Sequence, residues 1–228
     1  MVSTYIAPPT RKRIILIFDV ETTGLLPKKT KGVDVIPIDQ YPYILQLSFA
    51  LYDIYNRNII RSYDSYVRIP EHIEISEYVT NLTGINKEIC QTKGNSIINV
   101  LSQFYDAYMI CEGLVAHNID FDKKMISIEI ERNRELIMKT APYCSTIFNP
   151  VYQKIKNIEE YCTMKYGTDV ADMKNESGLK KWPRLIELYG KLFDGEIPKG
   201  LHNSMNDVLA CLRCYLKMRH GINQTIII

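Results

Sequence analysis

The sequence predicts an α/β domain whose sheet begins with three antiparallel strands. Five apolar residues at positions 14–18 indicate a buried strand. Apolar and polar residues alternate at 43–52 and again at 59–67, which predicts two further strands joined by a polar hairpin loop at 53–58. Helical periodicity follows from position 96, with a short apolar strand at 114–116. A strand that follows a helix favours parallel pairing, so we expect a mixed sheet covered by helices.

The other elements are predicted from caps, periodicity and turn residues. Ser96 is a typical helix N-cap, and the apolar stripe after it extends to position 108. We expect a short helix within 70–81, a longer one from about position 120 toward 134, and a last short strand at 142–145. Weakly marked helices are expected between 149 and 179, and a Trp-Pro pair opens a helix over 182–193. The final helix starts near position 203 and stops by Gly221.

Length and composition predict a single domain. A chain of 228 residues with 46% apolar content can bury a full core. We assign 1–13 to a flexible N-terminal arm, 14–220 to the domain and 221–228 to a C-terminal tail without an evident role. The 28 basic and 26 acidic residues leave a net charge of +2, so overall charge does not announce a nucleic-acid partner.

The sequence carries no mark of secretion or of a membrane. The first residues lack the apolar core of a secretory signal, and no long apolar stretch follows. Six cysteines are scattered along the chain, and only Cys211 and Cys214 lie close together, inside a helical pattern. We expect reduced thiols that pack in the core rather than a zinc site. These observations predict a soluble intracellular protein, and they do not distinguish cytoplasm from nucleus.

Two carboxylates mark the end of the first strand. Asp19 and Glu21 are two residues apart and therefore point to the same face of a strand, while Val20 points to the other. Side-by-side carboxylates repel each other, and a hard divalent cation such as Mg²⁺ or Mn²⁺ relieves that repulsion most directly. The alternative is a solvated strand end followed by a turn.

Acidic and imidazole groups also end two later elements. The strand at 114–116 leads into His117 and Asn118, and the next helix begins with Asp120 and Asp122. Acids at a helix N-terminus have an ordinary explanation, because they compensate the helix dipole. The last helix is preceded by His202 and carries Asp207, five residues later.

Three motifs in order, FDVETTGLLP, VAHNIDFD and HNSMND, span most of the chain. They resemble the motifs of the DEDDh 3′-to-5′ exonucleases, the DnaQ-like family that includes polymerase proofreading subunits. The segments YPYILQLSFALYD and LTGINKE also look like family segments. The resemblance implies the ribonuclease H-like fold, in which the first three strands of a five-stranded sheet are antiparallel, the later two run parallel to the first, and helices cover both faces.

The resemblance also implies residue roles. Four carboxylates are expected to bind two Mg²⁺ or Mn²⁺ ions, namely Asp19, Glu21, Asp122 and Asp207. His202 takes the place of the family's general base, and Asp120 drops out because the motif places its acid after the aromatic residue. Substrate contacts fall on Thr22, Leu25, His117 and Asn118. For Leu25 and His117 the alternatives are loop packing and a strand-end histidine that bonds to the backbone.

The implied activity is hydrolysis of nucleic acid from a free 3′ end, with release of nucleoside 5′-monophosphates. A single strand is the expected substrate, with DNA preferred because the first motif has threonine where short-RNA members tend to have methionine. The alternatives are an RNA-trimming exonuclease and a catalytically silent nucleic-acid binder, although all four acids and the histidine are present. A polymerase is a candidate partner.

The sequence departs from the family pattern at few positions. Ser204 stands where the family often has alanine, and we expect neither it nor Cys211 and Cys214 to touch the predicted ligands. The loop at 26–41 is longer than a minimal member needs, and it is a candidate for shaping access to the site. Its lysines at positions 28, 29 and 31 are candidates for phosphate contact, and the alternative is an ordinary solvated loop.

Overall fold

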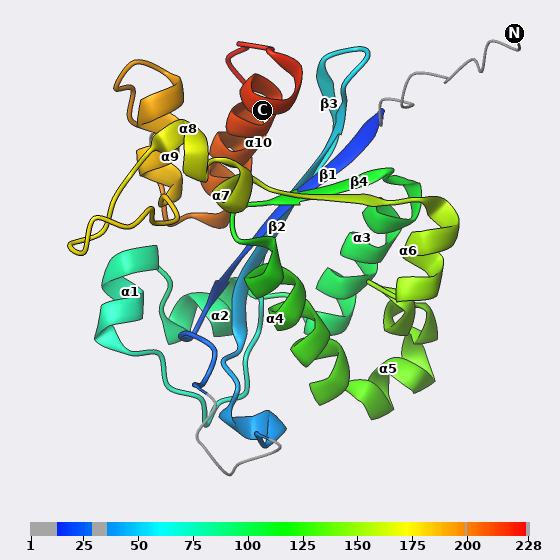
Figure 1. Ribbon diagram of the computed structural model, residues 1–228. Coiled ribbons are helices and arrows are strands. Elements are labelled where there is room, and N and C mark those ends of the chain that lie inside the picture. The colour runs from blue at the N-terminus through cyan, green and yellow to red at the C-terminus, as the bar shows by residue number, and fades with distance from the viewer. Residues whose placement is uncertain (1–12, 29–35, 199, 227–228) are drawn as a thin grey trace, which may run out of the picture.

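A mixed five-stranded sheet organises the fold of this chain, for which a computed structural model describes residues 13–28, 36–198 and 200–226. The strand order is β3-β2-β1-β4-β5 (Figure 1). Strand β1 pairs antiparallel with β2, β2 antiparallel with β3, and β4 runs parallel to both β1 and β5. The strands are β1 (Ile14–Thr22), β2 (Ile44–Asp53), β3 (Asn58–Tyr66), β4 (Gly113–Ala116) and β5 (Glu159–Cys162). The predicted mixed sheet is confirmed.

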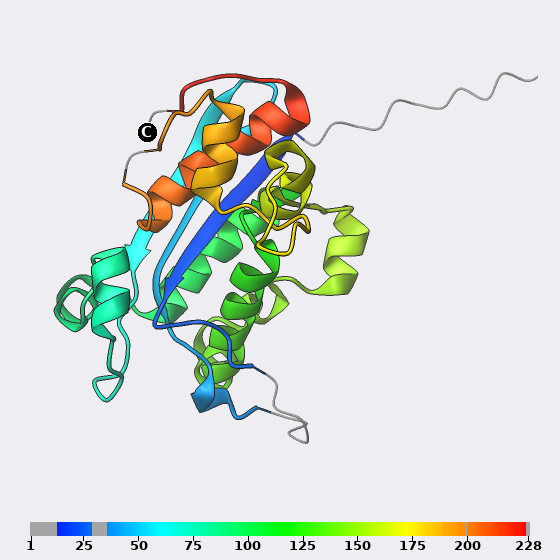
Figure 2. The same ribbon diagram turned by 60° about the vertical axis from the view of Figure 1, so that its left-hand side comes forward.

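Helices cover both faces of the sheet (Figures 1 and 2). Helices α3 and α4 lie on one face, and α10 lies on the other, in contact with β1, β2 and β4. The helices are α1 (Glu77–Thr83), α2 (Lys87–Lys93), α3 (Ile97–Ile110), α4 (Ile119–Arg132), α5 (Arg134–Thr140), α6 (Pro150–Lys156), α7 (Thr163–Tyr166), α8 (Thr168–Ala171), α9 (Leu185–Leu192) and α10 (Ser204–His220), with short 3-10 helices η1 (Ile38–Gln40) and η2 (Pro142–Thr146).

The predicted helix caps are in place. The Ser96 hydroxyl accepts a hydrogen bond from the backbone N–H of Asn99 at the start of α3, and the Asn203 side chain accepts one from Asn206 at the start of α10. Gly221 ends α10 with a φ of 66°, a left-handed conformation that favours glycine. The last helix therefore begins and ends where the sequence predicts.

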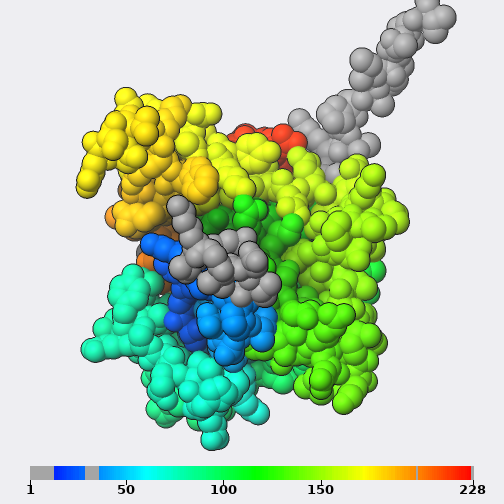
Figure 3. Space-filling model, turned by 60° about the horizontal axis from the view of Figure 1, so that its bottom comes forward, coloured from blue at the N-terminus to red at the C-terminus, as the bar shows by residue number. Residues whose placement is uncertain are grey.

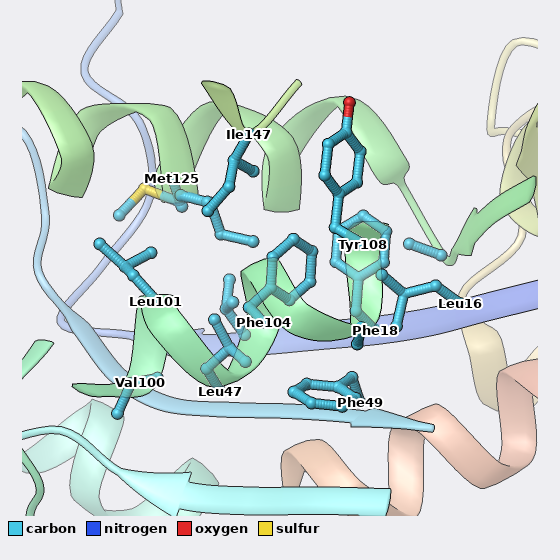
Figure 4. Close-up of a cluster of buried hydrophobic side chains, with 14 of the residues drawn as sticks. Leu16, Phe18, Leu47, Phe49, Val100, Leu101, Phe104, Tyr108, Met125 and Ile147 are labelled. Carbon is cyan, nitrogen blue, oxygen red and sulfur yellow. The ribbon is translucent and has the colours of Figure 1, made fainter. Parts of the chain in front are cut away.

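Aromatic rings fill the core between the sheet and helices α3 and α4 (Figure 4). Phe18 of β1 packs edge-on against Phe104 of α3, with ring centroids 5.3 Å apart. Ile15 and Ile17 lie an odd number of positions from Phe18 along β1, so they point to the opposite face and pack against α10. Because side chains alternate along β1, the strand contributes to the hydrophobic cores on both faces of the sheet.

The predicted fifth strand is in the wrong place. Residues 142–145 form the 3-10 helix η2, in which Pro142 occupies the first turn, where its missing N–H does no harm. The fifth strand is β5, whose Tyr161 and Cys162 are buried beside β4. The helix predicted from position 182 also begins later, because Arg184 caps α9 at Leu185.

The C-terminal tail has a packing role that the sequence did not reveal. Ile222 and Ile226 pack against the core beneath α10, and the Gln224 side chain donates a hydrogen bond to the Arg57 carbonyl oxygen. At the other end, Arg13 pairs with Asp53 at 2.9 Å and so belongs to the folded part of the chain. Residues 1–12 of the predicted arm lie outside the described residues.

The six cysteines are buried and free, as predicted. No helix within the described ranges is long and apolar enough to cross a membrane. The face shown in Figure 3 carries the C-terminal end of β1, in blue, between the cyan segment of α1 and α2 and the yellow segment that precedes α9. That face holds the site described next.

Candidate active site

Three carboxylates from two elements meet at the C-terminal half of β1. Asp19 and Glu21 come from β1, and Asp207 comes from the first turn of α10. Each offers one oxygen, and these oxygens lie within 4.8 Å of one another. The strand period explains the pair on β1, because Val20 points into the core on the other face of the sheet while its two neighbours face α10.

Asp122 joins from the opposite side of β1. Pairing between β1 and β4 stops at Ile17, so the backbone N–H of Val20 has no strand partner there. The Oδ1 atom of Asp122, in the first turn of α4, accepts a hydrogen bond from that N–H at 3.2 Å. Asp122 is only 2% exposed, and it lies outside the group of three that shares the 4.8 Å limit.

Ser204 fixes the start of α10 on the sheet. Its hydroxyl donates to the backbone carbonyl oxygen of Asp19 at 2.7 Å, and its backbone N–H donates to Oε1 of Gln46 at 3.2 Å. Both Ser204 and Gln46 are buried. The expectation that Ser204 touches none of the predicted ligands is therefore wrong, because a hydroxyl at this position ties the helix of Asp207 to the strand of Asp19.

A polar network on β2 extends this support. The Gln46 amide and the Ser48 hydroxyl both donate to Oδ1 of Asp64 on β3, at 2.7 and 2.6 Å. The alternation at 43–52 puts Gln46 and Ser48 on one face of their strand but predicts no role for them. Polar residues at alternate positions of an otherwise apolar strand were the available signal, since buried polar groups need partners.

Burial and mutual repulsion make the carboxylates reluctant to ionise. Burial, followed by the charges of Asp19 and Asp207, raises the pKa of Glu21 to about 8. Burial raises the pKa of Asp19, a hydrogen bond from Ser204 lowers it in part, and burial together with the charge of Asp19 raises the pKa of Asp207. Burial and the charge of Asp19 also raise the pKa of Asp122. A nearby positive charge would reverse these shifts.

The residues present fit a divalent cation. The Oδ2 atom of Asp19 is buried and has no hydrogen-bond partner among the described residues, which is costly unless a further group satisfies it. The atoms here that could ligate a metal are carboxylate oxygens, the ligands that hard cations such as Mg²⁺ and Mn²⁺ prefer. An acidic cluster with an unsatisfied inner oxygen matches a site for such an ion.

His202 lies at the mouth of this cluster, just before the cap of α10. Its side chain is exposed, and its backbone N–H donates to Oδ2 of Asp207 at 3.2 Å. The backbone φ of His202 is 67°, a conformation that a residue with a side chain rarely adopts. The same acid that closes the carboxylate group thus also holds the histidine loop.

Two predicted substrate residues lie on the turn after β1. The Thr22 hydroxyl donates to the carbonyl oxygen of Gly24 at 2.7 Å and so shapes the turn. Leu25 is 86% exposed, so the alternative of loop packing does not account for it. Its role in substrate contact stays a prediction, as does phosphate contact by Lys28, which is exposed; Lys29 and Lys31 lie outside the described residues.

The other two predicted substrate residues follow β4. Both ring nitrogens of His117 are engaged, with Nδ1 2.9 Å from the Thr163 hydroxyl and Nε2 3.1 Å from the Pro183 carbonyl oxygen. Burial lowers the pKa of His117 to about 4. This geometry favours the alternative of a structural histidine. Asn118 has a φ of 75° and caps α4 without a side-chain hydrogen bond.

Asp120 does not join the cluster. It is exposed and pairs with Lys165 on the surface of the molecule. A helix period of about 100° per residue turns Asp120 and Asp122 to different sides of α4. Removing Asp120 from the expected set of ligands therefore agrees with the geometry.

Comparison with known proteins identifies the family. The sequence model of the family RNase_T, described as Exonuclease, matches residues 16–215. The chain belongs to the DEDDh, or DnaQ-like, exonucleases of the ribonuclease H-like superfamily. The match extends from β1 to the last turns of α10 and so includes all four carboxylates and the histidine.

Two polymerases are among the relatives of this exonuclease-family chain. It is 30% identical to the DNA polymerase III PolC-type of Streptococcus mutans over 132 residues, which cover 58% of this chain and 8% of the polymerase. It is 26% identical to the PolC-type polymerase of Caldanaerobacter subterraneus subsp. tengcongensis over 144 residues, 62% of this chain and 9% of the polymerase. The chain thus spans less than a tenth of these relatives' length.

Solved structures of exonuclease I share the fold. The E. coli enzyme in complex with a dT13 oligonucleotide superimposes with a TM-score of 0.64 at 17% identity, covering 92% of this chain and 42% of the enzyme. Exonuclease I from Methylocaldum szegediense gives a TM-score of 0.62 at 15% identity, covering 92% of this chain and 41% of that enzyme. At such low identity the likeness concerns the fold.

Proposed function

We propose that this chain is a metal-dependent 3′-to-5′ exonuclease that releases nucleoside 5′-monophosphates from a single DNA strand. The observation that carries the proposal is the convergence of Asp19, Glu21 and Asp207 within 4.8 Å, with the buried Asp122 on the other side of β1. Membership of the exonuclease family supports it. A scaffold without activity would have no need to keep a buried, mutually repelling set of acids together.

The four carboxylates would hold two Mg²⁺ or Mn²⁺ ions. Bound there, divalent cations would supply positive charge that makes a nearby water more acidic and stabilises the leaving 3′-oxygen. The carboxylates of Asp19, Glu21 and Asp207 provide the counter-charge, and the hydrogen bond from Val20 keeps Asp122 oriented. Ser204 keeps the strand and the helix in register for this purpose.

His202 takes the role of general base. Its side chain is exposed and its backbone is bonded to Asp207, so the imidazole would accept the proton of a water that attacks beside the carboxylates. The hydrogen bond from its backbone to Asp207 keeps the loop beside the carboxylates without immobilising the ring.

The substrate is inferred from the relatives and from the turn after β1. The relatives are DNA polymerases, and the exonuclease I structure holds a dT13 oligonucleotide. An exposed Leu25 suits apolar contact with the terminal base, and Thr22 shapes the turn that presents it. A polymerase is the partner class that the relatives suggest. Single-stranded RNA of matched sequence is the alternative substrate to compare.

The proposal is tested by digestion of single DNA strands labelled at the 3′ or the 5′ end, with Mg²⁺, Mn²⁺ or a chelator. We expect the 3′ label to appear first as a nucleoside 5′-monophosphate, only when a divalent ion is present. Asp207→Asn is expected to reduce the rate by about a thousandfold, because losing one ligand charge costs about 4 kcal/mol of transition-state stabilisation.

The matched control is Asp120→Asn, which removes an acid of the same type from the surface of α4. It should leave the rate unchanged. Binding of the strand without any digestion would support a silent nucleic-acid binder, and faster digestion of the matched RNA strand would replace DNA by RNA as the substrate. Equal activity of Asp207→Asn and the unmodified protein would overturn the metal assignment.

A further inference from the structure

The only tryptophan of the chain, Trp182, lies in an exposed segment that precedes α9. We call residues 173–184 the Trp182 segment. It folds back on itself: Lys181 donates its backbone N–H to the Met173 carbonyl oxygen at 3.0 Å, and Asn175 donates to that of Leu179 at 2.8 Å. Trp182 is 62% exposed and Leu179 is 67% exposed. Two large apolar side chains therefore face solvent close together in sequence.

The segment is anchored to the end of β4, where the chain turns into the helix that carries Asp122. Pro183 is buried, and its carbonyl oxygen lies 3.1 Å from Nε2 of His117, the residue that directly follows β4. Asp122 lies five residues farther along, in the first turn of the next helix. On the other side, the backbone N–H of Arg184 donates to Oε2 of Glu187 at 2.7 Å. Trp182 is thus held in place by its neighbours while its indole ring stays largely free.

Basic residues stand two positions before and two positions after Trp182 in the sequence. Lys180 pairs with Asp169, whose side chain is 84% exposed, and Arg184 pairs with Glu187 while itself remaining 77% exposed. The Lys180 pair is open to water and contributes little, so Lys180 can exchange its partner for a phosphate at small cost. Glu187 is mostly buried but also pairs with Lys181, so it keeps a counter-charge if the exposed Arg184 turns to a phosphate. Figure 3 shows the yellow region of this segment on the same face as the blue end of β1.

We propose that Trp182 stacks on a base of the DNA strand, upstream of the nucleotide held at the carboxylate cluster. This inference rests on the proposed exonuclease function. Stacking on an aromatic ring is the usual way in which single strands are gripped without regard to sequence. The His117 to Pro183 contact fixes the backbone next to Trp182, so the segment that carries the ring needs little ordering when a strand binds. Lys180 and Arg184 then lie close enough along the segment to meet the adjoining phosphates.

Intrinsic fluorescence tests the contact directly, because Trp182 is the single emitter of its kind. The unmodified protein is titrated in chelator with a 5′-labelled oligothymidylate of about 12 nucleotides, a length within the usual range of single-strand sites. Label anisotropy reports binding, and tryptophan emission reports the indole. We expect emission to be quenched in step with the rise in anisotropy. Binding with unchanged emission would overturn the stacking contact, whereas a flat anisotropy would contradict the proposed function itself.

Kinetics of Trp182→Ala provide a second measurement. With the same strand, now in Mn²⁺, we expect KM to rise about five- to tenfold and kcat to stay unchanged. A rise of this size is at the lower end of what the loss of one stacked base produces. With a nitrophenyl ester of thymidine 5′-monophosphate, which fills only the terminal position, no change is expected. Trp182→Phe keeps a ring and should restore most of the affinity.

Tyr55→Ala is the matched control, since Tyr55 is also an exposed aromatic, at the turn between β2 and β3, with 86% of its surface open. It should change neither substrate's kinetics. An equal loss on the strand and on the ester would show that Trp182 acts through the fold of the site. An unchanged KM for the strand would also contradict the proposal.

Discussion

Single residues decide how the carboxylates are presented, and the buried hydroxyl of Ser204 is the clearest case. It satisfies the Asp19 carbonyl oxygen at 2.7 Å, at the point where β1 leaves its pairing with β4. The adjacent N–H of Val20 is satisfied by Asp122 instead. Two different helices therefore complete the backbone of one strand, and each brings an acid of the site with it.

His117 links the site to pH. Its pKa in the folded chain is about 4, below the ordinary value near 6.5, so the unfolded chain takes up the proton first as the solution becomes acidic. Keeping His117 neutral therefore contributes at most about 3 kcal/mol to the free energy of unfolding. This contribution is complete above about pH 6.5 and is lost as the pH falls toward 4. Urea unfolding of the protein and of His117→Gln from pH 7 to 4 measures it.

The gap in free energy of unfolding between the two proteins should shrink on acidification, because the variant has no ring to protonate. Activity at pH 7 provides a second readout, since His117 anchors the segment that carries Trp182. A gap that stays constant across this range of pH would contradict a neutral, buried His117.

Residue roles were only partly predictable from sequence. Asp19 and Glu21 could be paired because a strand has a fixed period of two, and Asp120 could be set aside because the motif placed the acid two residues later. The partners of Ser204, Gln46 and His117 could not be predicted, because their contacts join positions 18 to 185 residues apart in sequence. No local pattern encodes such distances.

Whole elements depend on buried polar anchors as well as on periodicity. Helix α4 is fixed to the start of β2 by Glu129, which is 3% exposed and accepts a hydrogen bond from the backbone N–H of Ile44 at 3.2 Å. Arg132 pairs with Glu129 and stacks its guanidinium 3.7 Å from the centre of the Tyr43 ring. This anchor fixes the helix that carries Asp122.

Glu129→Ala tests the anchor. We expect it to lower the free energy of unfolding by about 3–5 kcal/mol, because it leaves the largely buried Arg132 without its counter-charge. Chemical denaturation measures the change. Glu131 also lies on α4, and its exposed side chain pairs with Arg134 at the start of α5. Glu131→Ala should lower the free energy of unfolding by about 1 kcal/mol or less. Equal effects of the two substitutions would show that α4 does not depend on this pair.

Elements with a strong period were predicted well, and short ones were not. β2 and α10 carry ten and seventeen residues of clear pattern and were placed within a residue or so. Strand β5 has only four residues, and its exposed first half resembles a loop. A strand so short is defined by its partner β4 rather than by its own sequence, so residues 142–145 were chosen wrongly in its place.

At the scale of the whole molecule, topology brings the three motifs together. The C-terminal half of β1 lies at the centre of the sheet, where α4 approaches from one face and α10 from the other. Motifs separated by about a hundred residues therefore meet around one strand, and the resemblance to a known family supplied that arrangement where periodicity could not. The cost of gathering four carboxylates there is offset when cations bind.

The most direct test of that account is a titration with Mn²⁺ monitored by electron paramagnetic resonance, which counts free and bound ions. We expect the unmodified protein to bind two ions, Asp120→Asn to bind them equally well, and Asp207→Asn to lose at least one, because only Asp207 shares the 4.8 Å group with Asp19 and Glu21. Binding by Asp207→Asn that matches the unmodified protein, or no binding by either, would contradict the assignment of the carboxylate cluster as the metal site.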